Sequence, residues 1–452
     1  MAISLSGLGS GFDWQSMVDQ LRQVEQQQKV APLSAQKSKQ QSRLSAWQSM
    51  GSKLSTLKSS MDDLKDSSDF NVYKAKLASS SSTVTAESLL SATAGTSAGK
   101  GSYDITVNEL AKGRRLESDG AAFSSLTTTG VATGQLTVNG QTTATLDGMN
   151  LTQVRDAING LNSGTSATGV TASILQVTGG ETPTYRLLLA SDKTGVKDTV
   201  NNVMNGEVET SGSSLTFASK QTPLDASLTV NGTTVTRSTN SISDVIPGVT
   251  LALNKKDPAT TVTVAVDKDT EAIEGKVKKF VDAYNDVMGF INQQSTYTEG
   301  TNTTGGPLFG DATMKGIKSK IQSAVLGARS PSDAPLSSAG ITFASDNTLK
   351  LDSTKFQEAI KTNFDDTVSL FNTFGESLST SLNSYTDSID GTLTLQQKTI
   401  QSSMDNLDKR AASTQERIER TMTLLTNQFI KMDSAVGQMQ SQSSYLSAQL
   451  GL

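Results

Sequence analysis

Apolar residues recur at helical spacing near both ends of the chain, whereas they alternate with polar residues through the middle. Steps of three and four residues predict one helix from Trp14 and another around Trp47, with an interruption at Pro32. The same spacing returns at Ile273 and continues as a heptad pattern over residues 400–450, which favours a left-handed coiled coil. The chain is therefore predicted to be an α+β multidomain protein with helical ends and β-rich central domains.

The two terminal helical segments carry a narrow apolar seam that needs a partner. Its positions include Met, Thr, Ser and Ala as well as Leu, and such a seam packs weakly in isolation. We therefore expect these segments to be disordered until the protein assembles. The methionines are better explained as part of an oligomer seam than as a cofactor site. The predicted coiled-coil or oligomer seam consists of Trp14, Met17, Leu21, Leu407, Ile418, Met422, Leu425, Phe429, Met432, Val436, Met439, Leu446 and Leu450.

Alternating segments in the middle of the chain predict β-hairpins. Asn139-Gly140 and Asn231-Gly232 each follow an alternating run, and Asn-Gly at such a place favours a two-residue hairpin turn. The segments 135–140 and 227–232 read QLTVNG and SLTVNG, so they are near-copies of one another. We interpret them as one type of hairpin that is used in two domains.

The 452 residues include no cysteine and no histidine. The sequence therefore excludes disulfides, Cys/His metal sites and catalysis by a Ser-His-Asp or Cys-His arrangement. Two adjacent carboxylate pairs remain, but neighbours on a helix point about 100° apart and do not face each other. Asp62-Asp63 is better explained as a solvated helix face, and Asp365-Asp366 as a helix start. No catalytic, metal-binding or cofactor-binding residue is predicted, and we expect the protein not to be an enzyme.

Hydrophobic residues make up only 35% of the chain and charged residues 18%, which favours several modest domains over one large core. The net charge of −5 lacks the basic footprint of a nucleic-acid binder, and no Lys/Arg cluster points to a membrane surface. No apolar run is long enough to span a membrane, and the start of the chain has no signal-peptide pattern. We expect a protein that either stays in the cytosol or leaves it without a cleaved signal peptide.

Several short segments, in order along the chain, carry a resemblance to a known family. Residues 6–13 read SGLGSGFD and are followed by MVDQL at 17–21, while SSYL stands at 443–446 near the C-terminus. The other matching segments are Leu228–Gly232, Asp244–Leu251, Phe280–Asn285, Gly306–Asp311 and Gly340–Thr342. With these motifs the sequence resembles the flagellar filament cap protein family, also called hook-associated protein 2. The resemblance covers nearly the whole chain and is weakest between residues 113 and 221.

The resemblance implies terminal coiled-coil helices, a helical-bundle leg domain and two inserted β-rich head domains. In that arrangement the chain runs through the leg into the heads and then returns. The implied segments are 1–42 with 392–452 for the terminal coiled coil, 43–76 with 269–391 for the leg domain, 77–112 with 222–268 for one head domain, and 113–221 for the outer head domain.

Within the leg domain, two helical seams are implied to pack against each other. One seam comes from the N-terminal part of the chain and the other from the segment that returns from the heads. The two sets are Trp47, Leu54, Leu57 and Met61, facing Ile273, Val277, Phe280, Tyr284 and Val287.

The resemblance also implies a function at the distal tip of the bacterial flagellar filament, outside the cell. The protein would form a homo-oligomeric ring of about four to six subunits, promote the folding and insertion of exported flagellin, and prevent flagellin from leaking away. The implied partners are other copies of the chain, flagellin, the hook–filament junction protein and a cytoplasmic export chaperone at the C-terminal helix. Export by the flagellum-specific type III system would need no cleaved signal peptide. Neither nucleic acid nor a membrane is an expected partner.

Other interpretations stay open on the residues alone. Another flagellar axial protein, either a hook–filament junction protein or a filament subunit, would share the helical ends and β-rich inserts. An intracellular coiled-coil scaffold is compatible with the heptads, and a secreted glycosidase could work with carboxylates and no histidine. The tail motif and the stretch 228–251 favour the cap. A surface adhesin role of the head domains is neither supported nor excluded.

Overall fold

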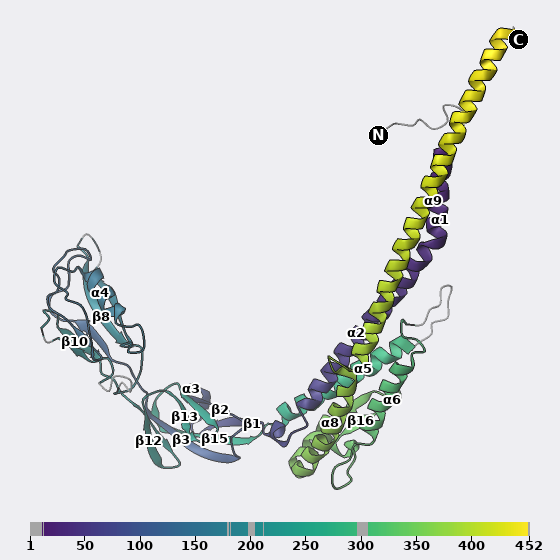
Figure 1. The fold of residues 1–452 in the computed structure, drawn as a ribbon. Helices are drawn as coiled ribbons and strands as arrows, with labels where there is room; N and C mark the ends of the chain where they lie inside the picture. Colours follow the sequence, from purple (N-terminus) through teal and green to yellow (C-terminus); the bar gives the residue numbers. More distant parts are fainter. Residues whose placement is uncertain are drawn as a thin grey trace. The chain divides into compact units, whose positions relative to one another are not determined.

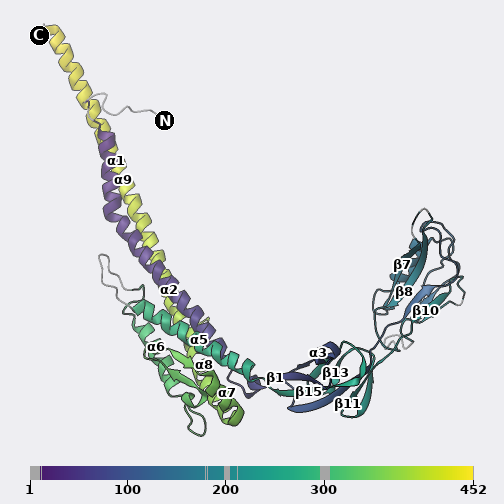
Figure 2. The same ribbon diagram turned by 180° about the vertical axis from the view of Figure 1, so that it is seen from behind.

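The computed structural model describes residues 11, 13–178, 180, 182–197, 204–210, 212–295 and 306–450. The chain divides into two compact units. The helical unit comprises residues 1–70 and 271–452, and the head unit comprises residues 71–270. Helices dominate the first unit and strands the second (Figure 1, Figure 2). The glycine-rich N-terminal motif lies outside the described residues, apart from Gly11 and Asp13.

The helical unit consists mainly of the helices that the apolar spacing predicts. Pro32 lies in the first turn of α2, where the missing backbone N–H has no helical partner to lose, so only Val30 separates α1 from α2. Its described residues also form two 3-10 turns, η1 (Ser67–Phe70) and η2 (Leu336–Ala339), and a short hairpin. The elements are α1 (Trp14–Lys29), α2 (Ala31–Asp62), α5 (Thr270–Ser295), α6 (Ala312–Leu326), β16 (Ile341–Phe343), β17 (Leu349–Leu351), α7 (Ser353–Thr362), α8 (Phe364–Thr386) and α9 (Thr392–Leu450).

The core of the helical unit lies where α2, α8 and the first part of α9 run side by side (Figure 1). Phe280 of α5 meets Phe374 of α8 edge to face, with ring centroids 5.4 Å apart. About one turn earlier on α8, Phe371 contacts the rings of Phe70 and Phe356. Aromatic contacts from both sides therefore make α8 the central element of this core.

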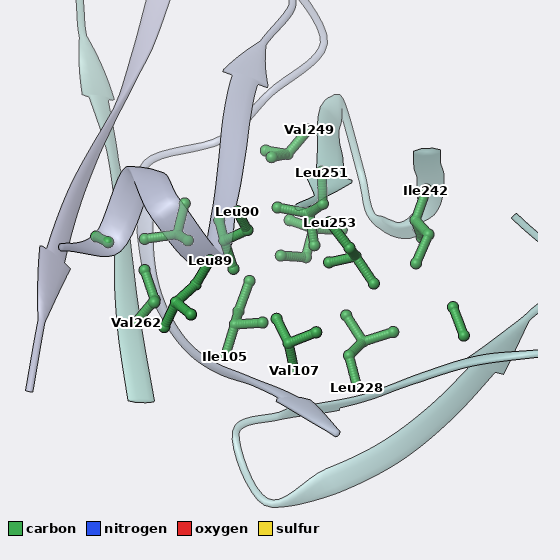
Figure 3. Close-up of a cluster of buried hydrophobic side chains, with 14 of the residues drawn as sticks. Leu89, Leu90, Ile105, Val107, Leu228, Ile242, Val249, Leu251, Leu253 and Val262 are labelled. Atoms are coloured by element: carbon green, nitrogen blue, oxygen red, sulfur yellow. The ribbon is translucent and has the colours of Figure 1, made fainter. Parts of the chain in front are cut away.

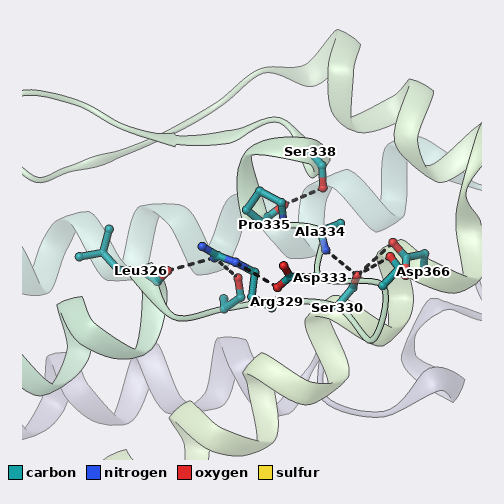
Figure 4. Close-up of polar contacts among 10 residues, drawn as sticks. Leu326, Arg329, Ser330, Asp333, Ala334, Pro335, Ser338 and Asp366 are labelled. Carbon is teal, nitrogen blue, oxygen red and sulfur yellow. Dashed lines mark hydrogen bonds and ion pairs between the residues drawn. The ribbon is translucent and has the colours of Figure 1, made fainter.

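Asp366 fastens a loop to the start of α8. Its carboxylate accepts hydrogen bonds from the hydroxyls of Ser330 and Ser332 at 3.1 and 2.7 Å (Figure 4). Ser330 in turn accepts a hydrogen bond from the backbone N–H of Ala334, so the loop between α6 and η2 is braced internally and tied to α8 through Asp366. Asp365 and Asp366 lie in the first turn of α8, which confirms the predicted helix start.

The interpretation as a solvated helix face holds for Asp63, which is exposed, but it is wrong for Asp62, which is half-buried. The hydroxyl of Ser379 on α8 donates a hydrogen bond to Asp62 Oδ1 at 2.8 Å, and Lys58 contacts Asp62 Oδ2 at 2.8 Å. Burial raises the pKa of Asp62, but hydrogen bonds from Lys58, Ser379 and Lys65 outweigh it and hold the pKa below its ordinary value. Asp62 thus joins α2 to α8 as a charged acceptor.

The inner part of the head unit is a β-domain built on two sheets. A five-stranded antiparallel sheet has the order β1-β15-β3-β11-β12, and a three-stranded sheet has the order β13-β14-β2. A single helical turn, α3 (Ala86–Leu89), precedes β2. The strands are β1 (Tyr73–Ser79), β2 (Leu90–Ala94), β3 (Gly101–Glu109), β11 (Ala226–Val230), β12 (Thr233–Arg237), β13 (Ser241–Ile246), β14 (Val249–Leu253) and β15 (Asp257–Lys268).

Side chains from both sheets meet in one apolar core. Ile105 and Val107 of β3 alternate with polar neighbours, so their side chains leave the same face of the sheet. They point toward Leu89, Leu251 and the other side chains of this cluster (Figure 3). The apolar residues of the alternating pattern that predicted strands here therefore form the inward face of the sheet.

The outer part of the head unit has its own core and contains a helix that the sequence interpretation missed. Asn150 and Gln153 form a capping box at the start of α4, and Leu151, Val154 and Ile158 are buried. A four-stranded sheet has the order β10-β4-β8-β7 and a smaller one the order β6-β5-β9. The elements are β4 (Arg115–Ser118), β5 (Thr137–Val138), β6 (Gln141–Thr142), α4 (Leu151–Gly160), β7 (Val170–Thr178), β8 (Thr184–Ser191), β9 (Val208–Glu209) and β10 (Phe217–Gln221).

The two Asn-Gly dipeptides that end alternating runs form the predicted hairpin turns. Asn139 and Gly140 have φ of 44° and 79°, and Asn231 and Gly232 have φ of 48° and 84°. Two successive positive φ angles define a type I′ turn, which joins β5 to β6 and β11 to β12. The near-copies therefore adopt the same turn in the two parts of the head unit.

The chain enters and leaves each part of the head unit through adjacent backbone segments. At the inner part, Tyr73 of β1 pairs with Lys268 of β15. At the outer part, Lys112 and Leu224 exchange backbone hydrogen bonds of 2.8 and 3.0 Å. The expected boundary between the leg domain and the head domain, at residue 76, falls inside β1. The pairing of β1 with β15 already begins three residues earlier, at Tyr73.

Candidate assembly surface on the terminal helices

Helix α1 lies antiparallel to the middle of α9 (Figure 1, Figure 2). The indole of Trp14 stacks on the ring of Phe429, with centroids 6.3 Å apart and planes inclined by 7°. Farther along, Lys37 Nζ of α2 lies 2.7 Å from Asp408 Oδ1 of α9. Because residue numbers rise on one helix as they fall on the other, the N-terminal helices and α9 form an antiparallel pair.

A small apolar cluster holds α1 against the facing part of α9. Trp14 is 3% exposed, although its indole nitrogen has no partner among the described residues. The side chains come from both helices and are spaced at intervals of three or four residues on α9, as a coiled-coil seam requires. The cluster consists of buried Trp14, Val18, Ile418 and Met422, with Val30, Leu425 and Phe429 partly buried against it.

Charged residues also take part in the pairing, beside this cluster and between it and the core of the helical unit. Arg22 Nε lies 3.5 Å from Glu419 Oε2, and Lys37 contacts Asp408 about three helical turns farther along α9. These side chains are partly exposed, so each pair contributes little stability, about 0 to 1 kcal/mol. The terminal pair is therefore held by a short apolar contact and weak ion pairs.

The predicted seam residues divide between the paired cluster and an exposed surface. Trp14, Ile418, Met422, Leu425 and Phe429 lie in the cluster. Leu407 is also buried, and Val436 is half-buried. The side chain of Leu450 lies outside what the structure describes. The exposed seam residues are Met17, Leu21, Met432, Met439 and Leu446.

The exposed seam on α9 follows one face of the helix beyond Phe429. Met432 and Met439 are seven residues apart, as are Met439 and Leu446, so they recur at the same heptad position. The helix continues from residue 430 to 450, a length of about 32 Å at 1.5 Å per residue. We name these exposed side chains, Met432, Met439 and Leu446, the distal seam.

All nine residues predicted to pack in the leg domain are buried. Met61 of α2 lies beside α8, since a Cβ added at Gly375 would come within 3.2 Å of Met61 Cε. Phe280 of α5 contacts α8 on its own side through Phe374. Direct contact between the two sets stays a prediction. The buried residues are Trp47, Leu54, Leu57 and Met61 on α2, and Ile273, Val277, Phe280, Tyr284 and Val287 on α5.

Tyr284 lies in a strongly desolvated part of the core of the helical unit. Burial raises the pKa of its phenol to about 12, because the charged phenolate would lie in an apolar environment. Its hydroxyl donates a hydrogen bond to the carbonyl of Asn347 at 3.2 Å, which places the hairpin of β16 and β17 against α5. Asn285 supports the same contact through the backbone of Leu349.

Sequence reasoning missed Val18 and the ion pairs of the terminal helices. Val18 follows Trp14 by four residues and could have been assigned to the seam in place of Met17. The pairs Arg22–Glu419 and Lys37–Asp408 join residues about 400 and 370 positions apart, so they become visible only once the antiparallel register is known.

Two further features are absent from the described part of the chain. There, no group of three or more acidic residues is arranged to hold a metal ion. None of the helices in the described ranges combines the length and apolarity needed to cross a membrane.

Two family models match the N-terminal and the C-terminal parts of the chain. The model of the flagellar hook-associated protein 2 N-terminus matches residues 10–114, and the model of its C-terminus matches residues 224–441. The B-type flagellar hook-associated protein 2 of Pseudomonas aeruginosa is 30% identical, over 94% of this chain and 92% of the relative. The flagellar hook-associated protein 2 of Escherichia coli K12 is 28% identical, over 99% of this chain and 98% of the relative.

A solved structure of similar fold agrees. The D1-D2-D3 domains of the flagellar cap protein FliD from Escherichia coli align with a TM-score of 0.59 and 26% identity, covering 78% of this chain and 99% of that one. The α+β multidomain fold predicted from the sequence is thereby confirmed. From both family models, the relatives and this fold, the chain belongs to the flagellar hook-associated protein 2 family, the flagellar cap proteins.

Proposed function

We propose that this chain assembles into a ring at the distal tip of the flagellar filament, where the ring holds exported flagellin while it folds and inserts. The observation that carries the proposal is the distal seam of α9. It presents apolar side chains at heptad spacing on a helix that extends beyond its paired region, and Met439 is 66% exposed. Such a seam gains stability when copies of the helix bury it together.

The weak pairing of α1 with α9 supports an assembly-dependent terminal coiled coil. Met17 and Leu21 of α1 are exposed on a helix whose neighbouring face, with Trp14 and Val18, is already buried. The terminal pair therefore has one face toward its own partner and a second face for neighbouring copies. A closed ring of about four to six copies would cover both faces.

Flagellin and the hook–filament junction protein are the further partners that we propose, on the strength of family membership. A cytoplasmic chaperone would cover the exposed apolar side chains of α9 before export, because they would otherwise associate prematurely. Export would follow the flagellum-specific type III route. The proposed role is structural, since the ring would shelter a folding chain and would not change a covalent bond.

Substitution within the distal seam tests the ring. Met439→Asp places a charge at the centre of the seam, so we expect monomers in native mass spectrometry and no rings in electron micrographs. Ser441→Asp is the matched control, since it adds the same charge to an exposed position two residues away on the same helix. Rings of Met439→Asp as abundant as those of Ser441→Asp would refute seam-driven assembly.

Deletion of the gene tests the cap function itself. We expect hooks without filaments and monomeric flagellin in the culture medium, and restoration of filaments by the wild-type chain and by Ser441→Asp. Filaments of normal length in the deletion strain would show that the chain does not cap the filament. Filaments restored by Met439→Asp would show that the cap works without the distal seam.

A further inference from the structure

The head unit contains four asparagines that are followed by glycine: Asn139, Asn159, Asn205 and Asn231. An asparagine before glycine is chemically the most labile, because glycine has no Cβ to shield its backbone nitrogen from the neighbouring carboxamide. Attack by that nitrogen releases ammonia, so the rate depends on how firmly the fold holds the carboxamide. The four sites differ in this respect.

The carboxamide nitrogen is held at two buried sites. Asn139 is 1% exposed, and its Nδ2 donates to the carbonyl of Thr168 at 2.7 Å. Asn205 is equally buried, and its Nδ2 donates to the carbonyls of Lys193 and Thr194 at 2.8 and 3.1 Å. In both places the departing group is bonded to the backbone of another segment and shielded from water.

The third site is held by a strand. Asn159 is half-buried near the end of α4, and both ends of its carboxamide pair with the backbone of Ala172. Its Nδ2 donates to the Ala172 carbonyl at 3.0 Å, while its Oδ1 accepts from the Ala172 N–H at 2.7 Å. Rotation of this side chain toward Gly160 would break both hydrogen bonds.

Asn231 differs from the other three. It is exposed, and among the described residues its Nδ2 donates no hydrogen bond, whereas its Oδ1 accepts one from the Asp104 N–H at 2.8 Å. The carboxamide oxygens of the other three asparagines also accept hydrogen bonds, so Asn231 is distinguished by its exposure and by a side-chain nitrogen that donates to no described residue. The space around Gly232 is open, since a Cβ added there would meet no atom within 4 Å.

We propose that Asn231 is a site of spontaneous deamidation in the folded protein. The Gly232 backbone nitrogen loses its proton to solvent and forms a bond to Asn231 Cγ. The bond from Cγ to Nδ2 then breaks, and ammonia leaves with a proton taken from solvent. Water opens the resulting succinimide to aspartate or isoaspartate. The net reaction is hydrolysis of a carboxamide to a carboxylate and ammonium, and it needs no oxidant or metal.

The near-copy at Asn139 provides an internal reference for this proposal. Both asparagines stand in a TVNG segment, and both are the first of the two central residues of a type I′ turn, with φ of 44° and 48°. Their sequence and turn geometry are therefore matched, and they differ in burial and in the partner of Nδ2. A difference in their deamidation rates in the folded chain is a direct measure of those two factors.

The experiment follows deamidation in the purified full chain. Folded protein is incubated at pH 8.5 and 37 °C, and tryptic peptides 221–237 and 116–155, which contain Asn231 and Asn139, are analysed by tandem mass spectrometry. Asn231→Asp supplies the standard for the aspartate product. We expect Asn231 to convert at least about tenfold faster than Asn139, the factor in rate that one buried hydrogen bond of about 1.4 kcal/mol contributes.

Denatured protein in 8 M urea separates the fold from the sequence. There, both TVNG sites should deamidate at similar rates, because neither carboxamide is bonded or buried. The proposal is overturned if Asn231 keeps its amide in the folded chain, or if Asn139, Asn159 or Asn205 converts as fast. It is also overturned if the ratio of the two TVNG rates is the same in folded and denatured protein.

Discussion

Trp14→Ala is the sharpest perturbation of the terminal helix pair. Trp14 is the largest side chain of the cluster that joins α1 to α9, and it stacks on Phe429. The nearest ion pair between the same helices, Arg22 with Glu419, is partly exposed and contributes little stability. Removing the indole therefore takes away the largest apolar side chain that joins the two helices, and it leaves the core of the helical unit untouched.

The expected loss can be worked from burial. A fully buried Trp replaced by Ala costs about 3 to 5 kcal/mol, and we take the lower end because Leu425 and Phe429 around it are only partly buried. The better helix propensity of Ala returns about 0.5 kcal/mol. A net loss of about 2.5 kcal/mol raises the population of the open pair about sixtyfold to a hundredfold.

Hydrogen exchange measured by mass spectrometry reports that population directly. Amides of α1 and of the facing part of α9 should exchange about sixtyfold to a hundredfold faster in Trp14→Ala than in wild type, while those of α5 and α8 keep their rates. Met17→Ala is the matched control, because Met17 is 40% exposed on the same helix and lies outside the cluster. We expect its effect on exchange to correspond to less than about 0.5 kcal/mol.

Two results would refute this reasoning. Equal exchange in Trp14→Ala and Met17→Ala would mean that the cluster does not hold the pair. A uniform acceleration across α5 and α8 would mean that the terminal pair and the leg core open together as one unit.

The remaining predictions concern a buried phenol and a crowded turn. The pKa of Tyr284 is about 12 in the folded chain, above the ordinary 10.0. The neutral phenol therefore contributes its full share to the free energy of unfolding below pH 10, and this share is lost as the pH rises through 12. Urea unfolding should show a loss of up to about 2.7 kcal/mol across this range that Tyr284→Phe lacks. Gly248→Ala should destabilise the chain by about 2 kcal/mol or more, since φ is 73° and the new Cβ would lie 2.3 Å from Ala98 N. Gly232→Ala should cost only the backbone strain of about 1 kcal/mol, because its φ is 84° but the space around it is open. Equal melting temperatures for Gly248→Ala and Gly232→Ala would contradict the proposed clash at Gly248.

Periodicity predicted the helices well because the apolar residues that a helix buries lie on one of its faces, and their spacing can be read from that helix alone. All nine residues assigned to the leg core are buried, and the heptads of α9 form one continuous helix. Periodicity does not say which partner covers a stripe. Trp14 and Met17 both fitted the N-terminal seam, yet the first is buried against α9 and the second is exposed. The choice depends on the antiparallel register, which is a tertiary property.

Turn chemistry was equally predictable, because Asn-Gly favours one backbone geometry locally. Asn139 and Asn231 both adopt it. Helix α4 was missed although Asn150 and Gln153 signal a capping box and Leu151, Val154 and Ile158 follow at helical spacing. Its ten residues form fewer than three helical turns in a segment whose other elements are strands, so the alternating pattern dominated the interpretation. Asp62 was misjudged because its partner Ser379 lies more than 300 positions away.

The paired entry and exit strands make each part of the head unit an exchangeable cassette. Since Tyr73 pairs with Lys268, and Lys112 with Leu224, the two ends of either insertion are already held side by side. A cassette with adjacent ends can be shortened, lengthened or replaced without changing the geometry that its host must accommodate. The outer part, residues 113–223, could therefore be swapped for an unrelated domain with neighbouring termini, which offers a way to graft new surfaces onto the chain while the helices are left as they are.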